Sequence, residues 1–160
     1  MAITPEPLTR EAFRPFGDVI EVSGNTAELI NQGNTQKYSN LAKLVADGEG
    51  RISVAIYRSK PVQLPFELRM LERHPLGSQA FFPLHNRPFP IIVALPCATP
   101  GPTDLRVFLS NGKQGINLHP GVWHHYQLSL EQESDYLVID RSGAGNYDEF
   151  NLENPVILKF

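Results

Sequence analysis

Hydrophobic and polar residues alternate along much of this chain with a period of two, the spacing of half-buried β-strands. The clearest case is residues 52–57, I-S-V-A-I-Y, in which the three isoleucine and valine side chains share one face. Residues 90–95 form a continuous apolar run, typical of a strand buried on both faces. The pattern predicts about eight short strands separated by turns. The other predicted strands span residues 18–22, 66–76, 79–84, 105–109, 115–118, 122–128 and 136–139.

Helical signals are few. Thr9 can cap a short helix that runs to Phe13, and residues 38–46 have helix-like spacing in a stretch that can equally be irregular. The 14 prolines and 12 glycines break helices and favour turns. We therefore predict an all-β, two-sheet sandwich or barrel in one domain spanning residues 1–160, with one or two short peripheral helices.

Three connecting segments carry more specific expectations. Residues 24–36 are polar and rich in Asn and Gly, which predicts a loop. Asn111-Gly112 is a strong signal for a type I′ β-hairpin. The segment 146–160 ends in V-I-L-K-F, so we expect it to pack on the core or on a second subunit.

Charge and composition narrow the range of partners. The net charge is −3 and no basic run exceeds two residues, which argues against nucleic-acid binding. The single Cys97 excludes an internal disulfide framework and fits a reducing compartment. No apolar run approaches the ~18 residues of a membrane span, and the first residues do not resemble a secretory signal. We expect a cytoplasmic protein that binds a small molecule and no membrane.

The candidate chemistry is concentrated in residues 115–125, G-I-N-L-H-P-G-V-W-H-H, which hold three of the five histidines. Histidine titrates near neutral pH and is the commonest metal ligand. A tight turn at Pro120-Gly121 is expected to bring His119 back towards the strand that carries His124. His125 points to the opposite face from His124, so we expect it to be a hydrogen-bonded core or interface residue and not a ligand.

A second polar cluster lies upstream in residues 72–79, E-R-H-P-L-G-S-Q. Glu72 and His74 are two residues apart and share a face of an extended segment, and Gln79 returns on the next strand. If these residues meet a histidine from 119–124 inside a barrel, they form a mixed nitrogen and oxygen site. Such a site suits a borderline divalent metal such as nickel, iron, manganese or zinc.

Both clusters resemble cupin motifs. Residues 119–124, H-P-G-V-W-H, are similar to the second cupin motif, P-x-G-x-x-H, and E-x-H-x4-Q at 72–79 is similar to the first, H-x-H-x4-E. The ordered phrases E-R-H-P-L-G-S-Q-A-F-F-P-L, N-G-K-Q-G-I-N, V-W-H-H and I-D-R-S-G resemble the bacterial ureidoglycolate lyase family more specifically. This resemblance extends over nearly the whole chain.

The resemblance implies a cupin-like β-barrel, a homodimer and a cytosolic role in allantoin breakdown. It also implies the reaction of (S)-ureidoglycolate to glyoxylate and urea, with Ni²⁺ as the metal. By this resemblance the metal ligands are Glu72, His74, Gln79 and His124. Glu72 and Gln79 depart from the general cupin pattern, which places histidine and glutamate at their positions.

The reaction requires a proton to leave the carbinol hydroxyl and a proton to reach the departing nitrogen. We assign that exchange to His119 or His124, whichever does not bind metal. An arginine can hold the substrate carboxylate through two parallel hydrogen bonds, and Arg73 and Arg141 are the candidates. Arg73 alternates away from Glu72 and His74, so it can instead serve a salt bridge.

Three alternatives stay open on the sequence. An amidohydrolase acting on the same substrate would release ammonia in place of urea. A non-catalytic cupin would bind a small carboxylate or a sugar. A metal-dependent oxygenase is disfavoured, because it usually has a more histidine-rich ligand set than Glu72 and Gln79 provide.

Overall fold

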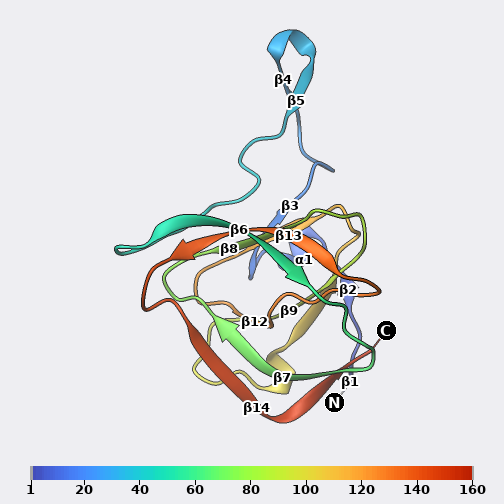
Figure 1. The fold of residues 1–160 in the computed structure, drawn as a ribbon, viewed down its shortest axis with the longest axis vertical. Coiled ribbons are helices and arrows are strands. Elements are labelled where there is room, and N and C mark those ends of the chain that lie inside the picture. Colours follow the sequence, from blue (N-terminus) through green and yellow to red (C-terminus); the bar gives the residue numbers. More distant parts are fainter. Residues whose placement is uncertain (1, 160) are drawn as a thin grey trace.

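Two curled β-sheets face each other and form most of the protein (Figure 1). The computed structural model describes residues 2–159. The seven-stranded sheet contains, in spatial order, β1 (Ala2–Ile3), β14 (Asp148–Leu158), β7 (Phe66–Arg73), β12 (Trp123–His124), β9 (Pro90–Ala94), β10 (Arg106–Leu109) and β2 (Glu6–Pro7). The five-stranded sheet contains β3 (Gly17–Ile20), β11 (Gly115–Leu118), β8 (Gln79–Pro83), β13 (Ser134–Ser142) and β6 (Arg51–Ser59).

The remaining elements are short. Strands β4 (Glu28–Ile30) and β5 (Thr35–Lys37) pair only with each other in the described chain, around the 3-10 turn η1 (Asn31–Gly33). The one α-helix is α1 (Arg10–Phe13) among the described residues, and a second 3-10 turn is η2 (Pro102–Asp104). Thr9 caps α1 as predicted, because its hydroxyl accepts a hydrogen bond from the Ala12 amide at 3.2 Å. The prediction of an all-β, cupin-like fold is confirmed.

Strand β9 explains how the two halves of the core are built. Ile91 and Val93 on one face join an apolar cluster that fills the space between the sheets. Ile92 and Ala94 on the other face join a second cluster on the far side of the seven-stranded sheet. Residues 90–94 are therefore all apolar because both faces of this strand are buried, whereas Leu95, just after the strand, is half exposed. The C-terminal segment packs on the second cluster through Val156 and Leu158, so that prediction is confirmed as well.

Two predictions about connections are wrong. Residues 24–36 are not a plain loop, because they contain most of the β4–β5 hairpin. Asn111-Gly112 does not close a β-hairpin, because β10 pairs with β9 and β2 whereas β11 pairs with β3 and β8. The Asn111 side chain accepts a hydrogen bond from the Lys113 amide at 2.9 Å, and this local turn carries the chain from one sheet to the other.

His125 is an uncharged residue of the core. Only 6% of its surface is exposed, and the Phe66 ring lies 5.5 Å away in an edge-on arrangement. The Nδ1–H group donates a hydrogen bond to the Tyr126 carbonyl at 3.0 Å. Burial lowers the pKa of the His125 imidazole to about 4, because an imidazolium here would lose its hydration.

This buried imidazole predicts that the protein is destabilised by mild acid. The pKa of histidine in the unfolded chain is 6.5, so below that pH the unfolded chain binds a proton that folded His125 accepts only near pH 4. The free energy of unfolding should fall as pH drops from 6.5 to 4, and His125 should account for about 3 kcal/mol of the loss. Urea denaturation over this range should show a flatter pH dependence for His125→Asn. An unchanged slope would show that His125 is not the group responsible.

Candidate metal centre and active-site cleft

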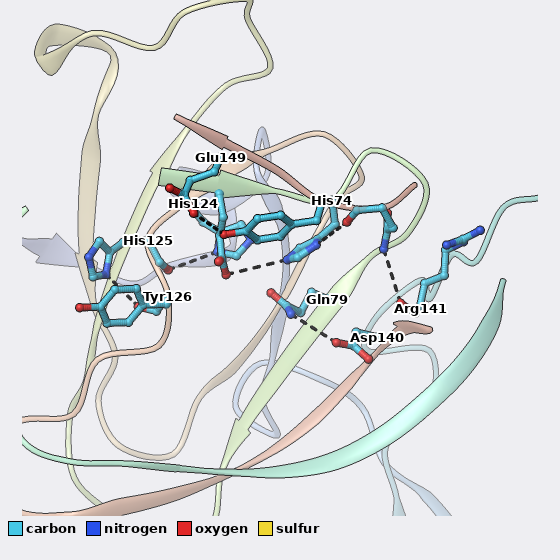
Figure 2. Close-up of polar contacts among 11 residues, drawn as sticks. His74, Gln79, His124, His125, Tyr126, Asp140, Arg141 and Glu149 are labelled. Atoms are coloured by element: carbon cyan, nitrogen blue, oxygen red, sulfur yellow. Dashed lines mark hydrogen bonds and ion pairs between the residues drawn. The ribbon is translucent and has the colours of Figure 1, made fainter. Parts of the chain in front are cut away.

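A two-residue strand inside the larger sheet, β12, sets the geometry of the site. β12 has only two residues and lies between β7 and β9, so that His124 is opposite Glu72 on one side and Val93 on the other. His74 follows directly after β7. Glu72 Oε1 lies 3.8 Å from His124 Nδ1 and 3.9 Å from His74 Nε2, and the two imidazole rings are 5.2 Å apart (Figure 2). Three of the predicted metal ligands, Glu72, His74 and His124, are therefore gathered at one point, and we refer to them as the triad.

The fourth predicted ligand comes from the opposite sheet. Gln79 is the first residue of β8, and its side chain points towards the same cleft, beside Asp140 of β13 (Figure 2). The cleft has a volume of about 610 Å³. Its wall is formed by Tyr57, Glu72, His74, Gln79, Tyr126, Asp140, Arg141, Gly143, Ala144, Gly145, Asn146 and Tyr147. It is thus open to a small molecule, and His124 lies behind this wall, 2% exposed.

Backbone carbonyl groups fix the orientation of both imidazoles. His74 Nδ1–H donates a hydrogen bond to the Asn146 carbonyl at 2.8 Å, and His124 Nδ1–H donates to the His125 carbonyl at 3.2 Å. Each Nε2 atom therefore carries the lone pair, which is the form that binds metal.

Buried atoms whose lone pairs accept no hydrogen bond provide a test of whether a metal fits the site. His74 Nε2, His124 Nε2 and Gln79 Oε1 are buried and have no hydrogen-bond partner among residues 2–159. Buried polar atoms without partners are rare, because each costs about 1–3 kcal/mol. Three of them beside one carboxylate form a nitrogen and oxygen donor set that suits a borderline divalent cation. The residues present therefore fit a metal ion: Glu72, His74 and His124 could hold it, and the Gln79 oxygen faces the same cleft.

The electrostatics of the site agree with this fit. Burial and the neighbouring His74 lower the pKa of His124 to about 3, so its ring is neutral at physiological pH. Burial raises the pKa of the Glu72 carboxyl, and His74 partly opposes that shift. A bound cation would stabilise the charged form of the Glu72 carboxylate and so offset the effect of its burial.

His119 and Arg73 lie away from the cleft wall. The turn at Pro120-Gly121 passes from β11 in one sheet to β12 in the other, so it does not fold His119 back as a hairpin would. His119 Nε2 instead lies 3.8 Å from Asp18 Oδ1, with 43% of its side chain exposed. Arg73 donates to Asp148 at 2.8 Å and its guanidinium lies 4.4 Å above the Trp123 ring. The structure therefore does not bring these two residues to the triad.

Arg141 does line the cleft, but its guanidinium is already engaged. Its Nε donates to the Asp47 carbonyl at 2.8 Å, and its Nη1 donates to the carbonyls of Gly143 and Ala144 at 3.2 and 3.3 Å. The side chain is buried, with 7% of the residue exposed. Arg141 thereby holds the 143–145 loop that forms one rim of the cleft.

Asp140 is a cleft residue that the sequence reasoning missed. Its carboxylate accepts a hydrogen bond from Gln79 Nε2 at 3.4 Å, which leaves the Gln79 oxygen free. A signal was present in the sequence. Along β13 the inward-facing positions are Tyr136, Val138 and then Asp140, so an acidic residue interrupts an apolar face. Tyr57, Tyr126 and Tyr147 also line the cleft and had no comparable signal.

Comparison with known proteins decides the family. The model of the ureidoglycolate lyase family matches residues 1–159. This chain belongs to the ureidoglycolate lyase family. A ureidoglycolate lyase of Pseudomonas aeruginosa (strain LESB58) is 51% identical over 142 residues, which cover 88% of this chain and 84% of that protein. One from Stutzerimonas stutzeri is 50% identical over 145 residues (90% and 85%), and one from Azotobacter vinelandii is 51% identical over 146 residues (90% and 88%).

The family assignment agrees with a cleft that several polar side chains line, beside three residues that could hold a metal ion. The resemblance inferred from the sequence is thereby confirmed. Among residues 2–159 no helix has the length and apolar character needed to cross a membrane.

The donor set predicts which histidines hold a metal ion. His74→Ala and His124→Ala should each weaken Ni²⁺ binding by more than about 100-fold, because each removes a ligand and not merely an outer contact. His119→Ala should bind Ni²⁺ like the wild type and is the matched control, since His119 lies beside Asp18. Isothermal titration calorimetry measures all three. Equal losses in the three variants would contradict the assignment.

Proposed function

We propose that this protein cleaves the carbon–nitrogen bond of (S)-ureidoglycolate and releases glyoxylate and urea. The observation that carries the proposal is the cluster of unpartnered lone pairs on His74, His124 and Gln79 beside Glu72, in a chain of the ureidoglycolate lyase family. The substrate is a carbinolamine, in which one carbon bears a hydroxyl, a carboxylate and the ureido nitrogen. The hydroxyl oxygen becomes the aldehyde oxygen as the bond to nitrogen breaks.

The charges along the cleft explain why a cation is needed. Glu72 and Asp140 are acidic, and within the described chain Arg141 is the one cleft-lining residue with a permanent positive charge. Arg141 donates to three backbone carbonyls, so little of its guanidinium is directed at a ligand. An anionic substrate would be repelled by this wall unless a bound cation reversed the local field.

A divalent metal held by Glu72, His74, Gln79 and His124 would supply that charge, chelate the substrate carboxylate and hydroxyl, and lower the pKa of the hydroxyl. We propose that this metal is Ni²⁺, as the family resemblance implies. Imidazoles and an amide bind metal through neutral donor atoms, so Glu72 would be the one charged ligand of the set. Their orientation is fixed in advance, because each imidazole donates its Nδ1–H to the backbone.

The proton exchange falls to a group on the cleft wall that does not hold the metal. We assign it to Asp140, whose carboxylate lies beside Gln79 and accepts a single hydrogen bond from it in the described structure. Asp140 can accept the proton of the carbinol hydroxyl and return one to the departing urea nitrogen. His124 is a proposed metal ligand that lies behind the cleft wall, and His119 and Arg73 do not line the cleft, so we give these three residues no proton-transfer or carboxylate-binding role.

Product analysis tests the proposed reaction. Purified protein incubated with Ni²⁺ and racemic ureidoglycolate should form glyoxylate and urea in equal amounts, above the spontaneous rate, and should consume one enantiomer. Release of ammonia in place of urea would place the chemistry at the ureido carbonyl. Absence of turnover with metal bound would contradict the proposal and favour a binding protein.

The role of Asp140 predicts a separation of catalysis from metal binding. Asp140→Asn keeps the size of the side chain and removes the proton acceptor, so kcat should fall by about 10²–10⁴-fold. Bound Ni²⁺ should remain at the wild-type level, because Asp140 is not in the donor set. Glu149→Gln is the matched control, since Glu149 accepts a hydrogen bond from Tyr147 at 2.8 Å and does not line the cleft. If Asp140→Asn retained full kcat, the assignment would be wrong.

A further inference from the structure

His74 depends on a distant part of the chain for its orientation, whereas His124 does not. His124 Nδ1–H donates to the carbonyl of the next residue, so the acceptor is supplied locally. His74 Nδ1–H donates to the carbonyl of Asn146, which lies 72 residues further along the sequence. The direction of the His74 Nε2 lone pair is therefore only as well defined as the position of the Asn146 carbonyl.

The Asn146 carbonyl belongs to a short segment, residues 143–147, that connects β13 to β14 and that we call the connecting loop. Gly143 and Gly145 have positive φ angles of 116° and 75°, a conformation that other residues rarely adopt. Asn146 itself is buried, with 9% of its surface exposed, so both polar atoms of its side-chain amide need partners. The position of the loop is therefore set by the partners that this amide finds.

Four hydrogen bonds tie the connecting loop to its surroundings in a closed ring. The Leu76 amide donates to Asn146 Oδ1 at 2.8 Å, and Asn146 Nδ2 donates to the Arg141 carbonyl at 3.5 Å. Arg141 Nε donates to the Asp47 carbonyl at 2.8 Å, and the Asp47 amide donates to the Leu76 carbonyl at 2.8 Å. Leu76 follows His74 by two residues, so the ring joins the segment that carries the histidine to the loop that carries its acceptor.

Arg141 is closely enclosed in this ring. A Cβ atom at Gly77 would lie 2.5 Å from Arg141 Cβ, and a Cβ atom at Gly50 would overlap the guanidinium group. Arg141 Nη1 also donates to the carbonyls of Gly143 and Ala144 in the connecting loop. The planar guanidinium thus serves three backbone carbonyls at once, which the single ammonium group of a lysine could not do in the same geometry.

We propose that Arg141 and Asn146 are positioning residues for the metal centre, because they hold the Asn146 carbonyl where it keeps His74 in the Nδ1–H tautomer. A neutral imidazole can carry its proton on either nitrogen, and its hydrogen bonds select one of them. With the proton on Nε2, His74 would present an N–H group to the metal in place of a lone pair. Arg141 thus acts on a metal ligand and not on the substrate carboxylate. This role rests on the proposed function only in that it takes His74 to be a metal ligand.

Nitrogen-15 NMR of the metal-free protein tests the tautomer, because protonated and unprotonated ring nitrogens differ in chemical shift. The His74 signals are assigned by their loss in His74→Gln, and in the wild type they should show only the Nδ1–H form. Asn146→Ala keeps the backbone carbonyl but removes the side-chain bonds to Leu76 and Arg141, so His74 should become a mixture of both tautomers. His124 is the internal control and should stay in the Nδ1–H form, because its acceptor lies outside the loop.

Isothermal titration calorimetry with Ni²⁺ provides the second measurement. Asn146→Ala should weaken Ni²⁺ binding by about 10–100-fold, the usual cost of losing a group that orients a metal ligand. Arg141→Lys should have the same two effects, and if this buried substitution prevents folding, Asn146→Ala alone carries the test. The matched control is Asn151→Ala, which removes an exposed amide of β14 that donates to Glu149 at 3.4 Å. This control should leave the tautomer and the Ni²⁺ affinity unchanged.

A purely structural role for Asn146 would lower the free energy of unfolding but leave the tautomer and the Ni²⁺ affinity of the folded protein as they are. An unchanged tautomer or an unchanged affinity in Asn146→Ala would therefore overturn the proposal. A wild type with the His74 proton on Nε2, or equal losses in Asn151→Ala, would overturn it as well. A wild type that binds Ni²⁺ without cleaving ureidoglycolate would contradict the proposed reaction alone, since neither measurement uses the substrate.

Discussion

One register pair, His124 opposite Glu72, determines the rest of the site. β12 is two residues long, so its position depends on the neighbours β7 and β9 that it joins. A shift of one residue would turn His124 to the far side of the sheet and bring Trp123 or His125 into its place. Trp123 is held against a slip of this kind, because its indole N–H donates to the Cys97 carbonyl at 3.0 Å and its ring packs in the second cluster. The packing of the sheet thus fixes the chemistry of the site.

Burying polar atoms without hydrogen-bond partners costs free energy at this site, and a bound cation would offset that cost. Two buried imidazole nitrogens and an amide oxygen have no hydrogen-bond partner in the described chain, and they line the same site as a carboxylate with a raised pKa. The fold does not relieve them with hydrogen bonds, although it satisfies the opposite side of each imidazole with a backbone carbonyl. Metal-binding histidines show this arrangement: one ring nitrogen donates a hydrogen bond to the protein, and the other is left to bind the cation.

The sequence predicted the strands better than their partners. Period-two alternation and the apolar run at 90–95 depend on which face each residue buries, and that information is local. The turns at Asn111-Gly112 and Pro120-Gly121 have the local chemistry of hairpins, yet both carry the chain between sheets, because pairing depends on distant strands such as β2, β3 and β8. The prediction that His119 would return towards His124 failed for the same reason, because the Pro120-Gly121 turn leads into the other sheet. The β4–β5 hairpin was missed because most of its residues are polar and none of those in the two strands is fully buried, so it has no apolar alternation to detect.

The proposed metal ligands could be predicted from the sequence. Glu72 and His74 share a face of one extended segment, and the resemblance to cupin motifs pointed to Gln79 and His124. Asp140 was not identified, because its closeness to Gln79 arises from pairing between β8 and β13. The same limit applies to Arg141, whose buried contacts with loop carbonyls depend on how residues 47 and 143–144 are placed.

The most direct test of the metal centre is anomalous X-ray diffraction from crystals of the Ni²⁺-loaded protein, recorded on both sides of the nickel edge. The account predicts one strong anomalous peak within coordination distance of His74 Nε2, His124 Nε2 and the Glu72 carboxylate, with Gln79 facing it. A peak beside His119 and Asp18, or the absence of a peak at the triad in metal-saturated crystals, would contradict it.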